Sequence, residues 1–409
     1  MIILGIETSC DETALSIIEI GAEKNADDGV GVKIIANQVL SQIELHKQYG
    51  GVFPMLAKRE HGKNLVPLLK KTLEEANFLV PAKQKKHSDT LANIGMDWEH
   101  DAELKKSFLE FIPTIDKPPV DLISVTAGPG LEPCLWTGLN FAKALSVSWN
   151  IPTVAANHME GHMLVALLQA VTSEKFKVKS GNKENSEFQI QTPNFPALAL
   201  LISGGHTELV LMKNWLEYEI VGRTRDDAAG EAFDKVARIL GLPYPGGPEI
   251  SRLADSARKS PANHELKLPR PMLHSDNLDF SFSGLKTAVL YLVKKLPAPL
   301  DEKTKAEIAL EFEDAVTDVI ISKIKQAIET FGIQTLILGG GVVANAHIRE
   351  ETEKMAREQN ITLKLPVINH ATDNALMIAL AGYFNRKKAF TEKTGLLSVK
   401  ANGNLSFQY

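Results

Sequence analysis

The stretch PALALLISGGHTELVLM, residues 196–212, joins two apolar runs through a Ser-Gly-Gly-His-Thr turn. Short apolar runs bounded by glycine-rich turns predict a strand, a tight turn and a second strand. The stretch IILGIETSCDETALSIIEI, residues 2–20, follows the same plan, with two strands around a polar turn. Because such hairpins occur in both halves of the chain, we expect two related α/β domains that face a cleft.

Other strands are followed by helical patterns. The stretch VDLISVTAGPG, residues 120–130, predicts a strand and a loop, and LNFAKALSVSW, residues 139–149, predicts the helix after them. The stretch TLILGGGVVAN, residues 335–345, again predicts a strand and a glycine loop, before a helix at 346–359. This alternation is typical of α/β proteins.

The 409 residues are predicted to form an N-terminal α/β lobe at 1–155, a C-terminal α/β lobe at 156–395 and a polar tail at 396–409. Two polar stretches interrupt the pattern, and we interpret 83–119 and 173–195 as surface insertions. Within the first, DWEHDAELKKSFLEFI could form one amphipathic helix. The second has the composition of a loop or a disordered segment.

Composition excludes several classes of protein. The net charge of −5 is unlike that of a strongly basic nucleic-acid binder, so RNA contacts must come from a local patch or a partner. Two cysteines without CxxC spacing argue against a disulfide scaffold. No apolar run reaches the length of about 18 residues that a membrane helix needs, and the first residues lack the basic region of a signal peptide. We therefore expect a cytoplasmic protein with no membrane partner.

The stretch NHMEGHMLVALL, residues 157–168, places His158 and His162 on one face of a predicted helix. Such a pair can bind a metal or can be structural. Glu160 is not placed as the general base of an H-E-x-x-H peptidase. Gly161 costs roughly 1 kcal/mol relative to alanine inside a helix, which indicates that backbone space is needed there.

A third ligand for a metal must come from elsewhere in the chain. The stretch NHATDNALMIALAG, residues 369–382, offers His370 and Asp373 just before a helix. The alternative is that Asp373 serves as the N-cap of that helix.

Several segments are suited to a nucleotide. The glycines at 204–205 and 339–341 follow strands and let backbone N–H groups approach phosphate, although neither loop is a Walker motif. Asp234, inside a predicted helix, is placed to accept from ribose hydroxyls, and YPGGP at 244–248 is a turn near the same ligand. In GIETSCDET, residues 5–13, the polar side chains Thr8, Ser9, Asp11 and Glu12 crowd one turn. The alternatives are ordinary tight turns and solvated side chains.

Together these segments resemble one family. GIETSCDET, AGPGL, NHMEGH, LISGGHT, DDAAGEAFDKVARILGLPYPGGP, DFSFSGLKTA, GGGVVAN and ATDNALMIA occur in the order found in TsaD-type tRNA threonylcarbamoyladenosine transferases, once named O-sialoglycoprotein endopeptidases. The resemblance covers roughly residues 1–82, 120–170 and 197–390.

The resemblance implies the actin/sugar-kinase/Hsp70-like (ASKHA) fold, with two duplicated α/β lobes around a central cleft. It implies transfer of a threonylcarbamoyl group from threonylcarbamoyl-AMP to N6 of adenosine 37, with release of AMP, in tRNAs that read codons beginning with A. A TsaB-type paralogue and a TsaE-type ATPase are the implied partners.

The resemblance also implies the residues of the site. The metal ligands would be His158, His162 and Asp373, in the C-terminal lobe. The acyl-adenylate would be bound by Leu201, Ile202, Ser203, Gly204, Gly205, Asp234, Gly247, Ser251 and Asn345. Asp11 and Glu12 are the candidate catalytic residues, with Asp11 as the acceptor of the amine proton or as a group that orders the site.

Two histidines and one carboxylate suit one divalent metal, Fe(II) or Zn(II), and we expect Fe(II). Some residues depart from the family pattern: Glu132, Pro133 and Trp136 replace small apolar residues, and His370 is a possible extra ligand. The competing functions are a small-molecule kinase of the same fold class, a metallopeptidase and a non-enzymatic scaffold.

Overall fold

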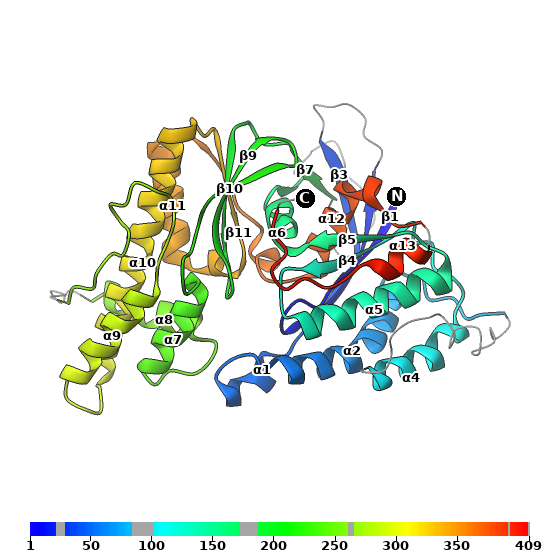
Figure 1. Cartoon of the computed structure of the whole chain (residues 1–409), viewed down its shortest axis with the longest axis horizontal. Coiled ribbons are helices and arrows are strands. Elements are labelled where there is room, and N and C mark those ends of the chain that lie inside the picture. Colours follow the sequence, from blue (N-terminus) through cyan, green and yellow to red (C-terminus); the bar gives the residue numbers. More distant parts are fainter. Residues whose placement is uncertain (22–28, 84–100, 172–186, 261–265, 392, 408–409) are drawn as a thin grey trace, which may run out of the picture.

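The computed structural model describes residues 1–21, 29–83, 101–171, 187–260, 266–391 and 393–407. It consists of two lobes, each built around one mixed β-sheet (Figure 1). None of the helices in these ranges combines the length and the apolarity that crossing a bilayer requires.

The first sheet has seven strands. In spatial order they are β5 (Thr153–Asn157), β4 (Leu122–Gly128), β1 (Ile2–Glu7), β2 (Glu12–Ile20), β3 (Val30–Ser41), β7 (Glu187–Ile190) and β6 (Leu168–Ala170). Strands β1, β2 and β3 form an antiparallel meander, and β4 and β5 add to β1 in parallel. The predicted hairpin at 2–20 is therefore confirmed.

The second sheet has five strands. They are β10 (Glu217–Arg223), β9 (Thr207–Asn214), β8 (Ala197–Ile202), β11 (Thr335–Gly339) and β12 (Thr362–Lys364). In this sheet β8, β9 and β10 form an antiparallel meander. Strand β11 pairs with β8 in parallel, and β12 pairs with β11 in parallel. Five strands of each sheet thus share one order, third–second–first–fourth–fifth, which confirms the duplicated ASKHA-type architecture.

Helices cover the outer faces of both sheets. Around the first lobe lie α1 (Ile43–His46), α2 (Pro54–Glu75), α4 (Ala102–Phe111), α5 (Glu132–Trp149) and α13 (Lys393–Ser398). Around the second lie α7 (Ala229–Ile239), α8 (Gly246–Arg258), α9 (Ser283–Lys295), α10 (Glu302–Phe331) and α11 (Ala346–Glu358). Each set closes its own apolar core against one sheet.

Two helices, α6 (His158–Ala166) and α12 (Ala375–Phe384), lie between the sheets (Figure 1). They form a third core that contains apolar residues of both sheets, such as Ile3 of β1 and Leu201 of β8. A Cβ added to Gly161 would meet Met377 of α12 at 3.1–3.2 Å, so the expected need for backbone space is confirmed. A helix pair held on both sides is a rigid platform for a site.

The change of sheet does not coincide with the predicted boundary between residues 155 and 156. Strands β6 and β7 belong to the first sheet, because β7 pairs with β3, and α12 returns to pack on β1. As a division into folding units the boundary stays a prediction. In chain order, β7 ends at Ile190 and still belongs to the first sheet, and the second sheet begins with β8. This division depends on pairing between strands that are far apart in the sequence, and composition does not reveal it.

The segments interpreted as surface insertions are partly structural. Within 83–119, α4 packs on α2 and buries Leu104 and Phe108 completely. Within 173–195, β7 pairs with β3 and β6. The described residues of both segments therefore include parts of the lobe, because their apolar side chains complete a core that begins elsewhere.

The tail at 396–409 also packs on the protein. Gly130 N–H donates to the Gly403 carbonyl (3.1 Å), and the Phe407 ring is buried with its centroid 5.1 Å from that of Tyr218. The described residues of the predicted polar tail therefore contact the folded protein, since its backbone groups bind the loop before α5.

Phe108→Ala is expected to lower the free energy of unfolding by about 3–5 kcal/mol, because it opens a cavity in the first lobe. Denaturant unfolding would measure it. The exposed Glu110→Ala on the same helix is the control and should stay within about 0.5 kcal/mol. Equal stability of both variants would contradict the placement of α4 in the core.

Candidate metal centre and nucleotide cavity

Helix α6 begins beside the site. Asn157 is its N-cap, and its side chain accepts from the backbone N–H groups of Met159 and Glu160. His158 and His162 follow one turn apart, and their Nε2 atoms are 3.2 Å from each other. The i, i+4 spacing therefore aims both imidazoles at one point, as predicted.

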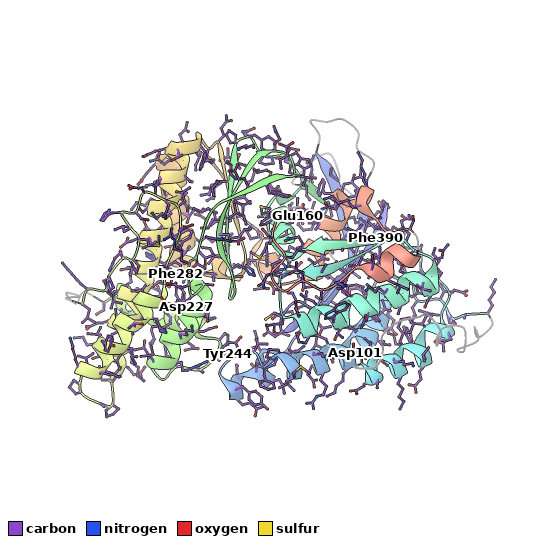
Figure 2. All side chains as sticks on the ribbon, viewed as in Figure 1. Asp101, Glu160, Asp227, Tyr244, Phe282 and Phe390 are labelled. Atoms are coloured by element: carbon purple, nitrogen blue, oxygen red, sulfur yellow. The ribbon has the colours of Figure 1, made fainter. Side chains whose placement is uncertain are left out.

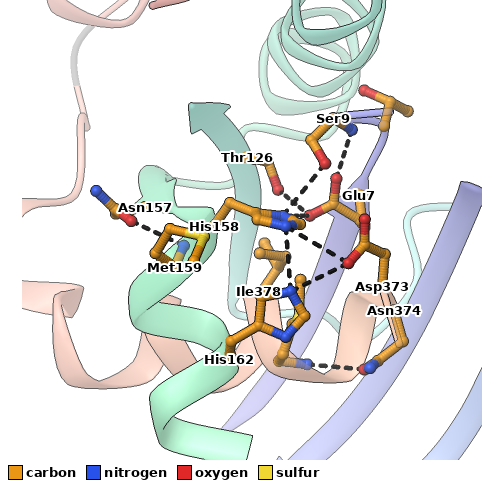
Figure 3. A network of polar contacts seen from close by, with 12 residues as sticks. Glu7, Ser9, Thr126, Asn157, His158, Met159, His162, Asp373, Asn374 and Ile378 are labelled. Atoms are coloured by element: carbon orange, nitrogen blue, oxygen red, sulfur yellow. Dashed lines mark hydrogen bonds and ion pairs between the residues drawn. The ribbon is translucent and has the colours of Figure 1, made fainter. Parts of the chain in front are cut away.

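Asp373 approaches the same point from the loop before α12. Its Oδ1 lies 3.0 Å from Nε2 of His162 and 3.5 Å from Nε2 of His158 (Figure 3). The N-cap of α12 is the next residue, Asn374, whose side chain accepts from Met377 N–H. The alternative role of Asp373 as an N-cap is therefore wrong, and its carboxylate faces the histidines.

The spacing of the three atoms fits one ion. Neighbouring ligands about 2.1 Å from a metal lie about 3.0–3.4 Å apart, from octahedral to tetrahedral angles. The separations of 3.0 and 3.2 Å lie within this range, and the third, 3.5 Å between His158 and Asp373, lies just above it. Within the described residues, no other group of three histidine, cysteine or acidic side chains is gathered in this way, and His370 is not part of this one.

A buried carboxylate orients His158 from behind. Oε2 of Glu7 lies 2.9 Å from Nδ1 of His158 and accepts from the Thr126 hydroxyl at 2.7 Å (Figure 3). A carboxylate on the second ring nitrogen fixes the tautomer that presents Nε2 to a metal. Glu7 is fully buried in the turn GIETSCDET, and we did not predict its role.

The charges of the site reinforce one another. Burial lowers the pKa of His158, but the carboxylates of Asp373 and Glu7 outweigh it and raise the pKa well above its usual value. Burial raises the pKa of Asp373, but the two histidines outweigh it and lower the pKa. A cation between the three ligand atoms would replace the proton that this arrangement favours.

Glu160 is remote from this chemistry. Its buried carboxylate accepts from the Tyr218 hydroxyl (2.9 Å) and from the Asn385 amide (2.8 Å). Those contacts tether α6 to β10 and to the end of α12, near the middle of the molecule (Figure 2). The expectation that Glu160 points away from the ligand face is confirmed, which removes the general base of a zincin-type peptidase.

A cavity of about 530 Å³ opens in the second lobe, a volume typical of small-molecule sites. Five of the predicted substrate residues line it: Gly204, Asp234, Gly247, Ser251 and Asn345. The side chains of Leu201 and Ile202 do not face it, because both are fully buried in β8. Ser203 and Gly205 lie in the adjoining turn, outside the lining.

Asp234 braces one wall of the cavity. Its Oδ1 accepts from Gly246 N–H at 2.7 Å, at the start of α8. Burial raises the pKa of its carboxyl group, which backbone N–H groups partly counteract. Its helix therefore presents a carboxylate beside the glycine turn that approaches the ligand.

Glu313 of α10 holds two other residues of the cavity lining. Its Oε1 accepts from the Ser251 hydroxyl (2.7 Å) and from the Asn345 amide (2.7 Å), and its Oε2 accepts from Arg258 (3.0 Å). We did not predict this residue. Its signal was a charged residue on the apolar face of a helix, between Phe312 and Val316, both fully buried.

The turn between β8 and β9 joins the two sites. Gly204 lines the cavity, while His206 in the same turn lies close enough to His158 and His162 for their charges to lower its pKa. Burial is the larger cause and, together with them, lowers the pKa of His206 to about 4. Gly339, at the end of β11, packs against the His162 backbone.

Asp11 and Glu12 lie in the β1–β2 turn of the first lobe. Burial raises the pKa of both carboxyl groups, and Asp11 further raises that of Glu12. Tyr244, on the side of the second lobe nearest to α1, is near enough for the charge of Asp11 to raise its pKa, although burial is the larger cause (Figure 2). The two lobes therefore bring Asp11 and the YPGGP turn toward one another.

Glu132, one of the residues that depart from the family pattern, contacts the C-terminal segment. Gly403 N–H approaches the Glu132 carboxylate at 3.5 Å, so this side chain faces the C-terminal segment. Lys143 Nζ lies 5.3 Å from the centre of the Trp136 ring and donates to the Val399 carbonyl (2.6 Å). Two of the residues that depart from the family pattern therefore lie at contacts with the C-terminal segment, Glu132 directly and Trp136 through Lys143.

Comparison with known proteins identifies the family of the chain. The family model described as tRNA N6-adenosine threonylcarbamoyltransferase matches residues 33–82, 104–177 and 180–380. It thus covers 104–119 and shortens the first extra segment to 83–103.

Two curated relatives carry that same name. One, from Thermosipho africanus, is 39% identical over 98% of both chains. The other, from Methylobacillus flagellatus, is 39% identical over 95% of this chain and 94% of its own length. Among solved structures, component A of (R)-2-hydroxyglutaryl-CoA dehydratase from Acidaminococcus fermentans covers 95% of this chain and 99% of its own, at 13% identity and a TM-score of 0.43. By the full-length match to family and relatives, the chain belongs to the tRNA N6-adenosine threonylcarbamoyltransferase family.

Proposed function

We propose that the protein transfers the threonylcarbamoyl group of threonylcarbamoyl-AMP to N6 of adenosine 37, in tRNAs that read codons beginning with A, and releases AMP. The observation that carries the proposal is that one turn, between β8 and β9, relates the triad to a cavity in the second lobe. His206 of the turn at 203–207 is near enough to His158 and His162 for their charges to act on it, and Gly204 of the same turn lines a cavity of about 530 Å³. One site suits the acyl group and the other suits the adenylate.

The triad would hold one divalent metal, Fe(II) or Zn(II), with Fe(II) as our choice. Two imidazoles and one carboxylate leave coordination positions open, which suits either ion. When bound, such an ion grips carboxylate or carbonyl oxygens of the substrate and polarises them.

The transfer step is a substitution at the carbamoyl carbon. The N6 amine forms a C–N bond, the C–O bond to the AMP phosphate breaks, and one proton leaves N6. We assign that proton to Asp11, because burial raises its pKa and makes the carboxylate a better base than an exposed aspartate. Glu12, which accepts from the Ser41 hydroxyl at 3.0 Å, orders the turn.

The remaining residues position the adenylate. Asp234 would accept from the ribose hydroxyls, and Gly247 and Gly204 would let the phosphate approach the backbone. Ser251 and Asn345, held by Glu313, would form the polar wall. Alignment of the amine with the carbonyl supplies much of the rate for a weak nucleophile.

The decisive experiment supplies threonylcarbamoyl-AMP and unmodified tRNA, then analyses the nucleosides by mass spectrometry. Threonylcarbamoyladenosine should form only with the adenylate, and position 37 should be the modified site. Phosphorylation of a small molecule without acyl transfer would instead assign a kinase. Cleavage of a glycoprotein by the metal-loaded protein would assign a peptidase.

We expect this chain alone to bind tRNA weakly, because its net charge is −5. A TsaB-type paralogue and a TsaE-type ATPase, in the cytoplasm, are the proposed partners that strengthen the complex. Affinity should fall as salt rises, since phosphate contacts release counterions. Tight, salt-insensitive binding by the isolated chain would contradict this prediction, and filter binding at two salt concentrations would measure it.

A further inference from the structure

Two buried histidines outside the metal centre lie beneath the turn that carries Asp11. His46 ends α1 and His61 lies in α2, and neither has exposed surface. Their rings connect through the side chain of Gln42, which is 4% exposed. Buried polar groups of this kind are kept only where their hydrogen bonds are made.

The ends of this network fix its direction. Phe53 N–H can only donate, and it lies 3.3 Å from Nδ1 of His46. The Cys10 carbonyl can only accept, and it lies 3.0 Å from Nε2 of His61. Hence Nδ1 of His46 is an acceptor and Nε2 of His61 carries a proton.

The middle of the network agrees with both ends. Nε2 of His46 lies 3.3 Å from Oε1 of Gln42, and Nε2 of Gln42 lies 3.4 Å from Nδ1 of His61. The Thr13 hydroxyl lies 2.8 Å from the same Nδ1. Each proton therefore has one place: Phe53 donates to His46, His46 to Gln42, Gln42 to His61, and His61 to Cys10.

Both histidines are neutral in this arrangement, because each ring uses one nitrogen as an acceptor. Burial lowers the pKa of His61 to about 4, against the hydrogen bond to the Cys10 carbonyl, which raises it. The Gln42 backbone adds a direct tie, since its N–H donates to the Asp11 carbonyl at 2.9 Å. The hydrogen bonds from His61 and from the Gln42 backbone thus end on the carbonyl groups of Cys10 and Asp11, the two residues before Glu12.

The outer end of the network meets the second lobe. The loop from 47 to 53 joins α1 to α2, and Arg238 of α7 donates to the Gly50 carbonyl within it. In Figure 1, α1 lies next to α7 and α8 across the boundary between the lobes. The loop therefore contacts one lobe outside and the Asp11 turn inside.

We propose that His46 and His61 are positioning residues. Through Gln42, they couple the position of the Cys10–Glu12 turn to the position of the loop that Arg238 contacts. A shift of this loop then displaces the Asp11 carboxylate. The role of Asp11 rests on the proposed function, but the hydrogen-bond network does not.

The first test places the protons directly. Nitrogen NMR of the full chain with labelled histidines should show both rings neutral and both protonated on Nε2. A proton on Nδ1 of either ring would overturn the proposal. This result stands even if no acyl transfer is found, so it separates failure of this proposal from failure of the proposed function.

The second test interrupts the network. Gln42→Met is similar in length but removes the side-chain hydrogen bonds to both histidines, together with the one that Gln42 donates to the Ala57 carbonyl at 3.4 Å. It should lower kcat about tenfold while KM for threonylcarbamoyl-AMP stays within about twofold. His46 should then lose its single tautomer in the NMR spectrum. If Gln42→Met does not fold, His61→Phe and His61→Gln replace it. Only the glutamine keeps an N–H for Cys10, so it should recover most of the kcat lost with phenylalanine.

The matched control is Thr72→Val on α2. Thr72 is equally buried, but its hydroxyl donates within its own helix to the Leu68 carbonyl (2.8 Å). It should leave kcat and both tautomers unchanged. An equal loss of kcat in this control, or wild-type kcat in Gln42→Met, would show that the network positions nothing.

Discussion

Alanine at any one of His158, His162 and Asp373 is expected to abolish stoichiometric metal binding and threonylcarbamoyl transfer together. The three ligand atoms lie within 4.8 Å of one another, and each is one of the three ligands that this group of side chains offers to an ion. With only two ligands left, the bound metal is expected to exchange with the solvent and to be lost on dialysis. Metal analysis after dialysis and the nucleoside assay would measure both losses.

Stability should change little in these variants if they are compared without metal. Thermal midpoints recorded in chelator remove the contribution of metal binding to the folded state. We expect differences of a few degrees, because no apolar core is opened. Collapse of the fold in all three variants would mean that the triad is structural.

Two neighbouring residues provide controls. His370→Gln should keep full metal content, since the His370 ring lies against Phe188, with centroids 6.1 Å apart, and outside the triad. Glu7→Gln acts through the orientation of His158 and should weaken metal affinity by roughly 10–100-fold without abolishing it. Loss of metal in His370→Gln would restore this residue as a ligand.

Asp234→Ala is expected to raise KM for threonylcarbamoyl-AMP by about one to two orders of magnitude, because a hydrogen bond to a charged group contributes about 1.5–3 kcal/mol. The variant loses the acceptor for ribose and the brace on Gly246 at once. Initial rates at varied adenylate concentration would measure the change, and metal content should remain stoichiometric.

Two further variants separate these causes. Asp234→Asn keeps an acceptor for Gly246 N–H and should fall between wild type and alanine. Glu231→Gln removes a carboxylate from the same helix, where it pairs with Lys235 on the surface, and should leave KM unchanged. An unaltered KM in Asp234→Ala would remove the ribose contact from the proposed site.

Local patterns predicted much of the molecule from the sequence. Hairpins, strand–loop–helix units and the helical spacing of His158 and His162 depend on residues a few positions apart. Turn chemistry and periodicity therefore predicted the first hairpin of each sheet, the histidine helix and the glycine loop at 339–341. The family motifs, read in order, predicted the duplicated fold and the chemistry.

Contacts between distant residues could not be predicted in this way. Asp373 lies 211 residues from His162, and only packing of α12 against α6 makes it a ligand while Asn374 takes the cap. The partners of Glu7 and Glu313 come from other elements, so the local pattern marks Glu313 only as a charged residue on an apolar helix face and does not show what either residue binds. The same holds for His46 and His61, whose link through Gln42 depends on how α1, α2 and β3 meet.

Burial also decided where the side chains of several predicted segments lie. Leu201 and Ile202 belong to the glycine-turn motif, yet β8 is covered on both faces and takes their side chains into two cores. Residues 102–119 and 396–407 look polar, but a few apolar side chains, such as Phe108 and Phe407, are enough to anchor each segment. Sequence alone determined the elements and the kinds of ligand, because these follow from short-range periodicity and residue chemistry. Tertiary structure decided which side chains share a site, because that depends on which buried surfaces pack together.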